Sequence, residues 1–312
     1  MYFRNLQCYR ISTEWPITID GLHKQLEKRG FKPCEHQEVA SHGWVPPCDG
    51  AELVHAIGDN WLMCLQSETK MLPTAVINRE ANKRAEKIGQ DQGFIPGRKF
   101  IKDLREQVAT EFLPRAFSRH HTINAWLNIQ KGWLVIDAAT KSKAETVVEM
   151  LRRTLDTFPL SLLETVHPPV SAMSMWLRNE PPAGFTIDSE LALQSIGADG
   201  ARIAFSHYDA QKEEITAHLE AARLPTKLAL TFESRVSFVL TENFDFKRIE
   251  FLDVVRDEAK ADDHEDARAL FDAEFALMTG ELLRLLDAVV DALGGERQRE
   301  PDLVDQAKKQ AA

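Results

Sequence analysis

Long apolar runs and paired cysteines are both missing from this 312-residue chain. No stretch reaches the roughly 18 consecutive apolar residues of a membrane-spanning helix, and the opening residues, MYFRNLQCYRIS, contain no apolar segment of signal-peptide length. No two of the four cysteines, Cys8, Cys34, Cys48 and Cys64, form a CxxC pair. We therefore expect a cytosolic protein with reduced, mostly buried thiols and no membrane partner.

The common motifs of catalysis and nucleotide binding are absent as well. The chain has no GxxxxGK[ST] loop, no GxGxxG turn, no GxSxG elbow and no HExxH motif. Zinc-ligand types occur at Cys34, His36, His42 and Cys48, but structural zinc sites usually pair ligands at short spacing, and only the first two lie close together. The sequence therefore predicts no enzyme, no catalytic residue, no metal and no cofactor.

The charge of the chain is acidic overall but unevenly distributed. A net charge of -10 would, if uniform, repel a polyanion. Residues 70–119, however, contain eleven Lys or Arg and six Asp or Glu, a net charge of +5, whereas residues 250–305 contain six and seventeen, a net charge of -11. This segregation predicts a positive face for nucleic acid on an acidic, soluble protein.

The pattern of expected elements indicates an α+β fold, and the length suggests two mixed sheet-and-helix domains. In residues 1–166 we expect a helix in DGLHKQLEKRG, with Asp20 as N-cap and Gly30 as its stop. INAWLNI and GWLVIDAA should form a β-hairpin, followed by a helix in KAETVVEMLRRTLDTF that Pro159 closes.

A second domain is expected over residues 167–296, after the HPPV segment. It should contain a strand in SAMSMWLR, a short helix capped by Asp188, a strand in ARIAFS, a hairpin of KLALTFES and RVSFVLTE, and a strand in FKRIEFL. Long helical segments should fill residues 265–293, with an interruption near Thr279-Gly280 and a stop at Gly294-Gly295. Residues 297–312 are expected to be a frayed tail.

A projecting basic helical hairpin is predicted at about residues 77–119. Two helices separated by a Gly-Pro turn each have a thin apolar stripe, made of Ile77, Ala81, Ala85 and Ile88 in the first and Ile101, Leu104, Val108 and Phe112 in the second. Each also has a basic stripe, Arg79, Lys83 and Lys87 in the first and Arg98, Lys102 and Arg105 in the second. An ordinary solvated face explains any single lysine better, whereas two aligned stripes support nucleic-acid binding about as well as a solvated face.

The segment FLPRAFSR places Phe117 between Arg115 and Arg119, directly after a proline that should end a helix. An aromatic side chain at such a break usually packs into the core, although it can also contact a partner. The adjacent His120 and His121 would point to opposite faces of a strand, which disfavours a shared metal.

Several segments, in their order and spacing, resemble the RdgC family of bacterial recombination-associated proteins. They are GWVPP at 43–47, KMLPTAVI at 70–77, FLPRAFSR at 112–119, EEIT at 213–216, TKLAL at 226–230 and LMTGEL at 277–282. The resemblance extends from about residue 2 to residue 296.

This resemblance implies a nucleoid-associated, non-enzymatic protein whose homodimer forms a ring around duplex DNA, independently of sequence. Binding of single-stranded DNA stays open. The family restrains RecA recombinase, and its aromatic residue matching Phe117 contacts the second subunit. The residues expected to bind DNA are Lys70, Arg79, Lys83, Lys87, Arg98, Lys102, Arg105, Arg115 and Arg119. The chain departs from the family at SHYDAQK, residues 206–212, where a more basic or amide-rich run is expected.

Two other functions compete with DNA encirclement. The acidic C-terminal half could be a protein-interaction module that binds the recombinase or another basic partner directly. Alternatively, the carboxylates of DEAKADDHEDA, residues 257–267, could belong to a metal-dependent nuclease. Their clustering fits a solvated loop beside a helix better than a metal site.

Overall fold

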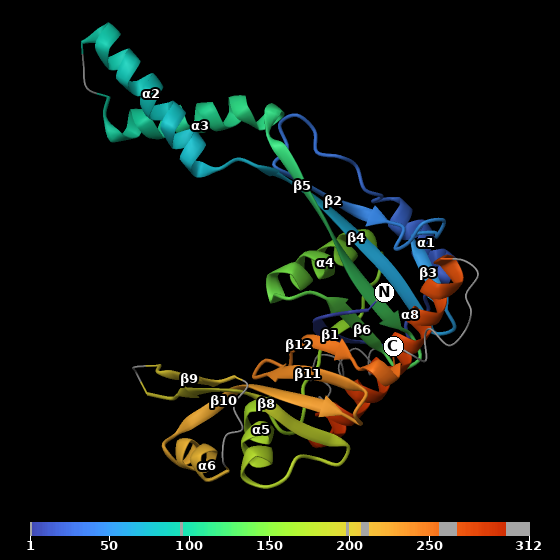
Figure 1. Ribbon diagram of the computed structural model, residues 1–312. Helices are drawn as coiled ribbons and strands as arrows, with labels where there is room; N and C mark the ends of the chain where they lie inside the picture. Colours follow the sequence, from blue (N-terminus) through green and yellow to red (C-terminus); the bar gives the residue numbers. More distant parts are fainter. Residues whose placement is uncertain (1, 94–95, 198–199, 207–211, 256–266, 298–312) are drawn as a thin grey trace, which may run out of the picture.

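A twelve-stranded sheet runs through a crescent-shaped molecule (Figure 1). The structure is a computed structural model that describes residues 2–93, 96–197, 200–206, 212–255 and 267–297. The strand order is β2-β4-β5-β6-β1-β12-β11-β10-β8-β9, with β3 beside β4 and β7 beside β1. The strand pairs are antiparallel, and helices lie on parts of both faces, which confirms the α+β class. None of the helices in the described ranges is long and apolar enough to cross a membrane.

The N-terminal half supplies the first seven strands and four α-helices. The strands are β1 Leu6–Ile11, β2 Ala40–Val45, β3 Val54–Ile57, β4 Asn60–Met71, β5 Phe117–Asn128, β6 Trp133–Asp137 and β7 Leu160–Leu162. The helices are α1 Ile19–Glu27, α2 Thr74–Gln92, α3 Arg98–Phe112 and α4 Lys141–Thr154, and a short 3-10 turn, η1, covers Leu113–Arg115.

The C-terminal half continues the same sheet. Its elements are α5 Pro169–Arg178, β8 Phe185–Ser195, β9 Arg202–Phe205, α6 Lys212–Glu220, β10 Arg223–Phe232, β11 Val236–Thr241, β12 Phe246–Phe251 and α8 Ala267–Ala292. The two halves meet where β1 pairs with β12, at Leu6 and Phe246. Whether residues 1–166 and 167–296 fold as separate domains stays a prediction.

Alternation along β5 divides its residues between two faces of the sheet. Ile123, Ala125 and Leu127 belong to a cluster with α1 and α4, whereas Trp126 belongs to a larger cluster with α5 and α8. Because successive strand residues point to opposite faces, every second residue of β5 lies on the α4 side. Figure 1 shows α4 on the concave side of the crescent, so this assignment decides which polar residues face inward.

Most local predictions for strands and hairpins are confirmed. Residues of β5 and β6 pair from Ala125↔Ile136 to Asn128↔Trp133, β10 pairs with β11, and β12 lies beside β11. The ARIAFS strand is β9. The last helix stops as expected, because Gly294 and Gly295 both have positive φ.

The helix-end predictions for α1 and α4 were partly wrong. Thr18, not Asp20, caps α1, since its Oγ1 accepts a hydrogen bond from the Gly21 amide at 3.1 Å. That helix ends at Glu27, before Gly30. Similarly, α4 ends at Thr154, well before Pro159, because the chain turns extended at Leu155.

Three predictions in the C-terminal half were wrong. SAMSMWLR is a helix, α5, because its buried residues Ala172, Met173, Trp176 and Leu177 recur at helical spacing. Asp188 caps no helix and lies within β8, where it accepts a hydrogen bond from Thr231 Oγ1 at 2.8 Å. The last helix continues unbroken through Thr279, whose hydroxyl bonds the Phe275 carbonyl at 2.9 Å.

All four cysteines are free thiols, but only Cys64 is buried, and the other three are half-buried. Burial raises the pKa of Cys64 to about 11. The expectation of mostly buried thiols is therefore met at one position. The tail beyond Arg297 lies outside the described residues.

Candidate nucleic-acid interface

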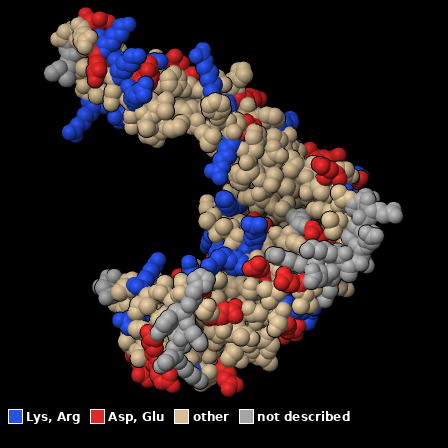
Figure 2. All heavy atoms as spheres, in the orientation of Figure 1, with Lys and Arg blue, Asp and Glu red and all other residues tan. Residues whose placement is uncertain are grey.

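Positive side chains gather on the concave side of the crescent (Figure 2), over α4 and the strands next to it, and again on the arm formed by α2 and α3. The convex side and the lower end show more carboxylates in the same view. The hollow is bounded by α2 and α3 at one end and by β8 and β9 at the other (Figure 1).

The arm is held together by its own small core. The four buried residues are Ala81, Ala85, Leu104 and Val108, and the four partly buried ones around them are Ile77, Ile88, Ile101 and Phe112. These are the eight residues of the two predicted apolar stripes. Arg84 adds a polar clamp between the helices, because it bonds Glu80 at 2.9 Å and Glu111 at 2.7 Å.

The six predicted basic residues of the arm are all exposed. They share the arm's surface with carboxylates, so that residues 74–112 contain eight Lys or Arg and six Asp or Glu, a net charge of +2. Lys102 lies 3.8 Å from Glu106 in an exposed pair, which stabilises little. The remaining three charges of the +5 on residues 70–119 come from Lys70, Arg115 and Arg119, which lie where the arm joins the sheet.

The join between arm and sheet carries an exposed apolar pair. Phe117 opens β5 and is 83% exposed, and its cross-strand neighbour Met71, the last residue of β4, is 49% exposed. The alternative that Phe117 packs into the core of its own chain is therefore wrong. Arg115 lies two residues earlier, in η1, and is also exposed.

The register of β4 and β5 places Lys70 and Arg119, which the sequence groups in one basic segment, on opposite faces of the sheet. Arg119 lies on the α4 face of β5, with Phe117 and His121, whereas Lys70 opposes Ser118 and so points to the other face. There the Lys70 ammonium donates to the carbonyl oxygens of Glu35 and His36. Arg119 thus faces the hollow, and Lys70 lies on the opposite face.

A cluster of polar residues near Arg119 was missed from the sequence. His42 of β2, Ser67 of β4 and His121 of β5 lie side by side in cross-strand register, and His42 Nδ1 is 2.7 Å from Ser67 Oγ. Burial lowers the pKa of His121, and the positive charges of Lys143 on α4, Arg119 and His42 lower it further. Only pairing between strands distant in sequence brings these groups together.

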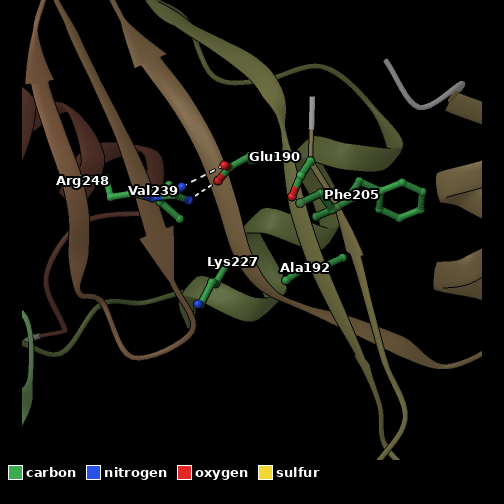
Figure 3. Close-up of a pocket in the computed structure, with 9 residues that line it drawn as sticks. Glu190, Ala192, Phe205, Lys227, Val239 and Arg248 are labelled. Atoms are coloured by element: carbon green, nitrogen blue, oxygen red, sulfur yellow. Dashed lines mark hydrogen bonds and ion pairs between the residues drawn. The ribbon is translucent and has the colours of Figure 1, made fainter. Parts of the chain in front are cut away.

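The inner face of β8–β12 is electrically mixed. Figure 1 shows α5 and α6 on the side of these strands that faces away from the hollow. On the hollow side, Arg248 forms an ion pair with Glu190, with Nη1 to Oε1 at 2.8 Å, and this bond raises the Arg248 pKa. The pair borders a pocket of about 190 Å³ that Lys227, Ala192 and Val239 also line (Figure 3).

A second cation of the C-terminal half, Lys247, is also bound within the chain. Lys247 donates to the Ala139 carbonyl at 2.8 Å and lies 3.3 Å from Asp245. Most of the doubtful segment, residues 207–211, lies outside the described residues. Arg248 and Lys247 are therefore already bound within the chain, whereas Lys143 of α4 is exposed.

Within the described ranges, no three His, Cys, Asp or Glu side chains are grouped as a metal site would require. Almost all of the acidic segment 257–267 lies outside those ranges.

Comparison with known proteins covers nearly the whole chain. A family model described as "Putative exonuclease, RdgC" matches residues 1–296. The chain is 44% identical over 301 residues to the recombination-associated protein RdgC of Dechloromonas aromatica, covering 95% of this chain and 98% of that protein. It is 41% identical to the protein of the same name from Cupriavidus necator, covering 96% and 100%, and 39% identical to that of Herminiimonas arsenicoxydans, with the same coverage. With full-length matches at these identities, the chain belongs to the RdgC family of recombination-associated proteins.

Proposed function

We propose that this chain is a non-enzymatic DNA-binding protein that encircles duplex DNA as a homodimeric ring, independently of sequence, and modulates recombination by restraining RecA recombinase. The observation that carries the proposal is the crescent itself, with cations on its concave side and an exposed Phe117–Met71 pair beside its arm. Two such crescents, related by a twofold axis, would enclose the hollow between them.

Phe117 is the proposed contact at the arm end. The Phe117 side chain is 83% exposed in the free subunit, so covering it with a partner is favourable. An isologous contact places a copy of the same patch opposite. Neighbouring Met71 can adapt its shape to that partner.

The opposite end of the crescent offers a second contact. The strand β9 is the last in the sheet order, so its outer edge pairs with no further strand among the described residues. Ile196 and Leu224, near the same end, are 67% and 37% exposed. Pairing of this edge with its copy would close the ring with main-chain hydrogen bonds.

Sequence independence follows from the kind of contact available. Arg115, Arg119 and the exposed lysines and arginines of α2 and α3 would contact phosphates, which carry no base information. The expected consequences are association with the nucleoid and competition with the recombinase for DNA. Single-stranded DNA can be bound by the same cations, with a shallower salt dependence.

A salt-titrated binding assay on two duplexes of unrelated sequence tests the function. Equal affinities, and log K falling with log salt at a slope near -0.9 per phosphate contacted, are expected. Strong preference for one sequence would contradict the proposal. Recombinase binding without DNA that survives charge reversal at Lys83, Lys87, Lys102 and Arg105 would instead support the protein-interaction module.

The description of the matching family favours a nuclease as the second candidate. The same duplexes, incubated at length with magnesium or manganese, distinguish the two. Intact DNA is expected. Degradation that follows the protein through purification, and that disappears with a chelator, would establish the nuclease.

A further inference from the structure

We propose that His121 and His42 form, with Arg119 and Lys143, a proton-dependent binding site for a DNA backbone phosphate, so that the affinity for DNA rises as the pH falls below 7. This inference rests on the proposed function, because it assigns a regulated subsite to the concave face. Nothing in composition or motif pointed to these histidines as a pair.

The placement of the four groups is the first argument. His121 and Arg119 lie on the α4 side of β5, two residues apart, and Lys143 is exposed in the first turn of α4, which contains no acidic residue. His42 reaches the same face through β2, because its partner Ser67 is the residue that opposes His121. Three strands and one helix thus direct positive or protonatable groups to one place.

The hydrogen-bonding state of His42 is the second argument. Its Nδ1 is 2.7 Å from the hydroxyl of Ser67, a fully buried side chain, which fixes the ring and leaves Nε2 for an external partner. Neutral His42 accepts from that hydroxyl, and protonated His42 donates to it. The bond therefore persists in both states, with Nε2–H available as a donor in each, and protonation adds a positive charge to the ring without breaking the bond.

The charges around the pair explain its dependence on protons. Lys143, Arg119 and His42 all disfavour the charged form of His121. His42 also borders a surface pocket whose charged lining residues are Lys28, Arg29, Lys32, Glu35 and Glu38. Glu68, which opposes His120 in the pairing of β4 with β5, lies on the opposite face.

The sign of the effect follows from linkage. Without DNA, burial and the surrounding cations lower the pKa of His121 and so favour its neutral form. A phosphodiester placed among these groups reverses the local field and raises the histidine pKa. Binding then takes up protons, and affinity increases as the pH falls through the pKa of the bound state. A rise of one pKa unit on binding gives a limit of about tenfold in affinity per histidine.

The experiment measures the ratio of Kd values for duplex DNA at pH 7.5 and pH 5.5, at constant ionic strength and in phosphate-free buffer. Wild type should bind about three- to tenfold more tightly at pH 5.5. His121→Gln should flatten this ratio toward one, and His121→Lys, charged at both pH values, should give a flat ratio with tight binding. His120→Gln is the matched control, one residue away on the opposite face, and should behave as wild type.

The outcomes separate the inference from the function on which it rests. An unchanged pH ratio in both His121 variants overturns the site, and so does loss of the ratio in His120→Gln. Wild type that binds DNA with no pH dependence refutes the proton-dependent site while the function stands. Absence of DNA binding at any pH refutes both. If a few millimolar inorganic phosphate abolishes the pH dependence without displacing DNA, the site takes free phosphate and the proposal is wrong.

Discussion

Neighbouring residues of β5 have different surroundings, because successive side chains point to opposite faces of the sheet. Phe117, Arg119 and His121 share the concave face, whereas Ser118 and His120 lie on the other face, near Glu68. The change of face at each residue separates the side chains that face the hollow from His120, the neighbour of the buried Glu68 carboxylate, within one short segment.

One glycine is indispensable at this scale. A Cβ at Gly43 would lie 2.2 Å from Cα and 2.5 Å from N of Phe31, because β2 runs directly against residues 30 and 31 there. These are backbone atoms, so the segment must move. We predict that Gly43→Ala lowers the free energy of unfolding by about 1–3 kcal/mol or more.

Chemical denaturation of the purified variant measures that loss. Gly280→Ala is the control, because a Cβ added at this exposed position in the middle of α8 would meet nothing within 4 Å. Alanine there should raise stability by about 0.5–1 kcal/mol. Equal stability of Gly43→Ala and wild type would contradict the close approach.

A buried histidine predicts acid sensitivity of the fold. His55 of β3 is 5% exposed, with Nδ1 at 3.0 Å from Arg268 Nη2 and Nε2 at 3.2 Å from Asp272 Oδ1. Burial lowers its pKa below 6.5, Asp272 acts in the opposite direction, and Arg268 lowers it further. The folded chain therefore resists protonation more than the unfolded chain does.

The resulting stability is complete above pH 6.5 and is lost as the pH falls toward the folded-state pKa. We predict a smaller loss of unfolding free energy between pH 7 and pH 5 in His55→Asn than in wild type. Denaturant titrations at several pH values measure it. The pKa of His121 is also lowered, so the pH dependence of stability in His121→Gln is measured for comparison. An identical pH slope in His55→Asn and wild type would refute the assignment.

At the scale of elements, the arm is a unit with its own core. Leu104 and Val108 of α3 pack on Ala81 and Ala85 of α2, and this is a separate cluster from the two that stabilise the sheet. We predict that Leu104→Ala costs about 2–5 kcal/mol, lost from the arm and not from the sheet.

Hydrogen exchange resolves that difference by segment. Amides of α2 and α3 should exchange faster in the variant, while those of β1, β6 and α8 keep their wild-type protection. As a control, Leu134→Ala, in the fully buried centre of β6, should accelerate exchange across the sheet. Uniform acceleration in Leu104→Ala would mean that the arm is not independent.

Elements with local periodicity could be predicted from the sequence, and others could not. The two stripes of the arm are regular, and all eight residues meet in one cluster. The segment of α5 is short and apolar enough to resemble a strand, and burial against β10 and β11 decides for the helix. Asp188 resembles a helix cap, but β8 uses its carboxylate for a bond to Thr231 on β10.

The candidate site likewise contains residues that the sequence could predict and residues that it could not. Phe117 and Arg119 can be singled out from one continuous segment, and the structure finds both exposed. The His42–Ser67–His121 row needs the register of three strands, which local sequence does not contain. For the same reason, sequence grouped Lys70 with Arg119, although the two face opposite sides.

For the whole molecule, the distribution of charge matters more than its sum. The chain is acidic at -10, yet its concave side gathers cations over α4 (Figure 2). On the inner face of the C-terminal half, Glu190 offsets the charge of Arg248 in an ion pair. In the proposed function, a positive hollow on an otherwise acidic protein orients DNA toward the hollow.

Ring closure around DNA is the central claim, and retention on closed circular duplex tests it most directly. Wild type and Phe117→Ala are loaded at low salt on linear and closed circular DNA of equal length, and the fraction bound is followed as salt rises, with oligomeric state measured by light scattering. Wild type should stay dimeric and be retained on circular DNA at salt concentrations that release it from linear DNA. Phe117→Ala should weaken the dimer, and the variant should dissociate from circular and linear DNA at the same salt concentration. Equal retention of wild type on linear and circular DNA, or wild-type behaviour of Phe117→Ala on both, would contradict closure of a ring through Phe117.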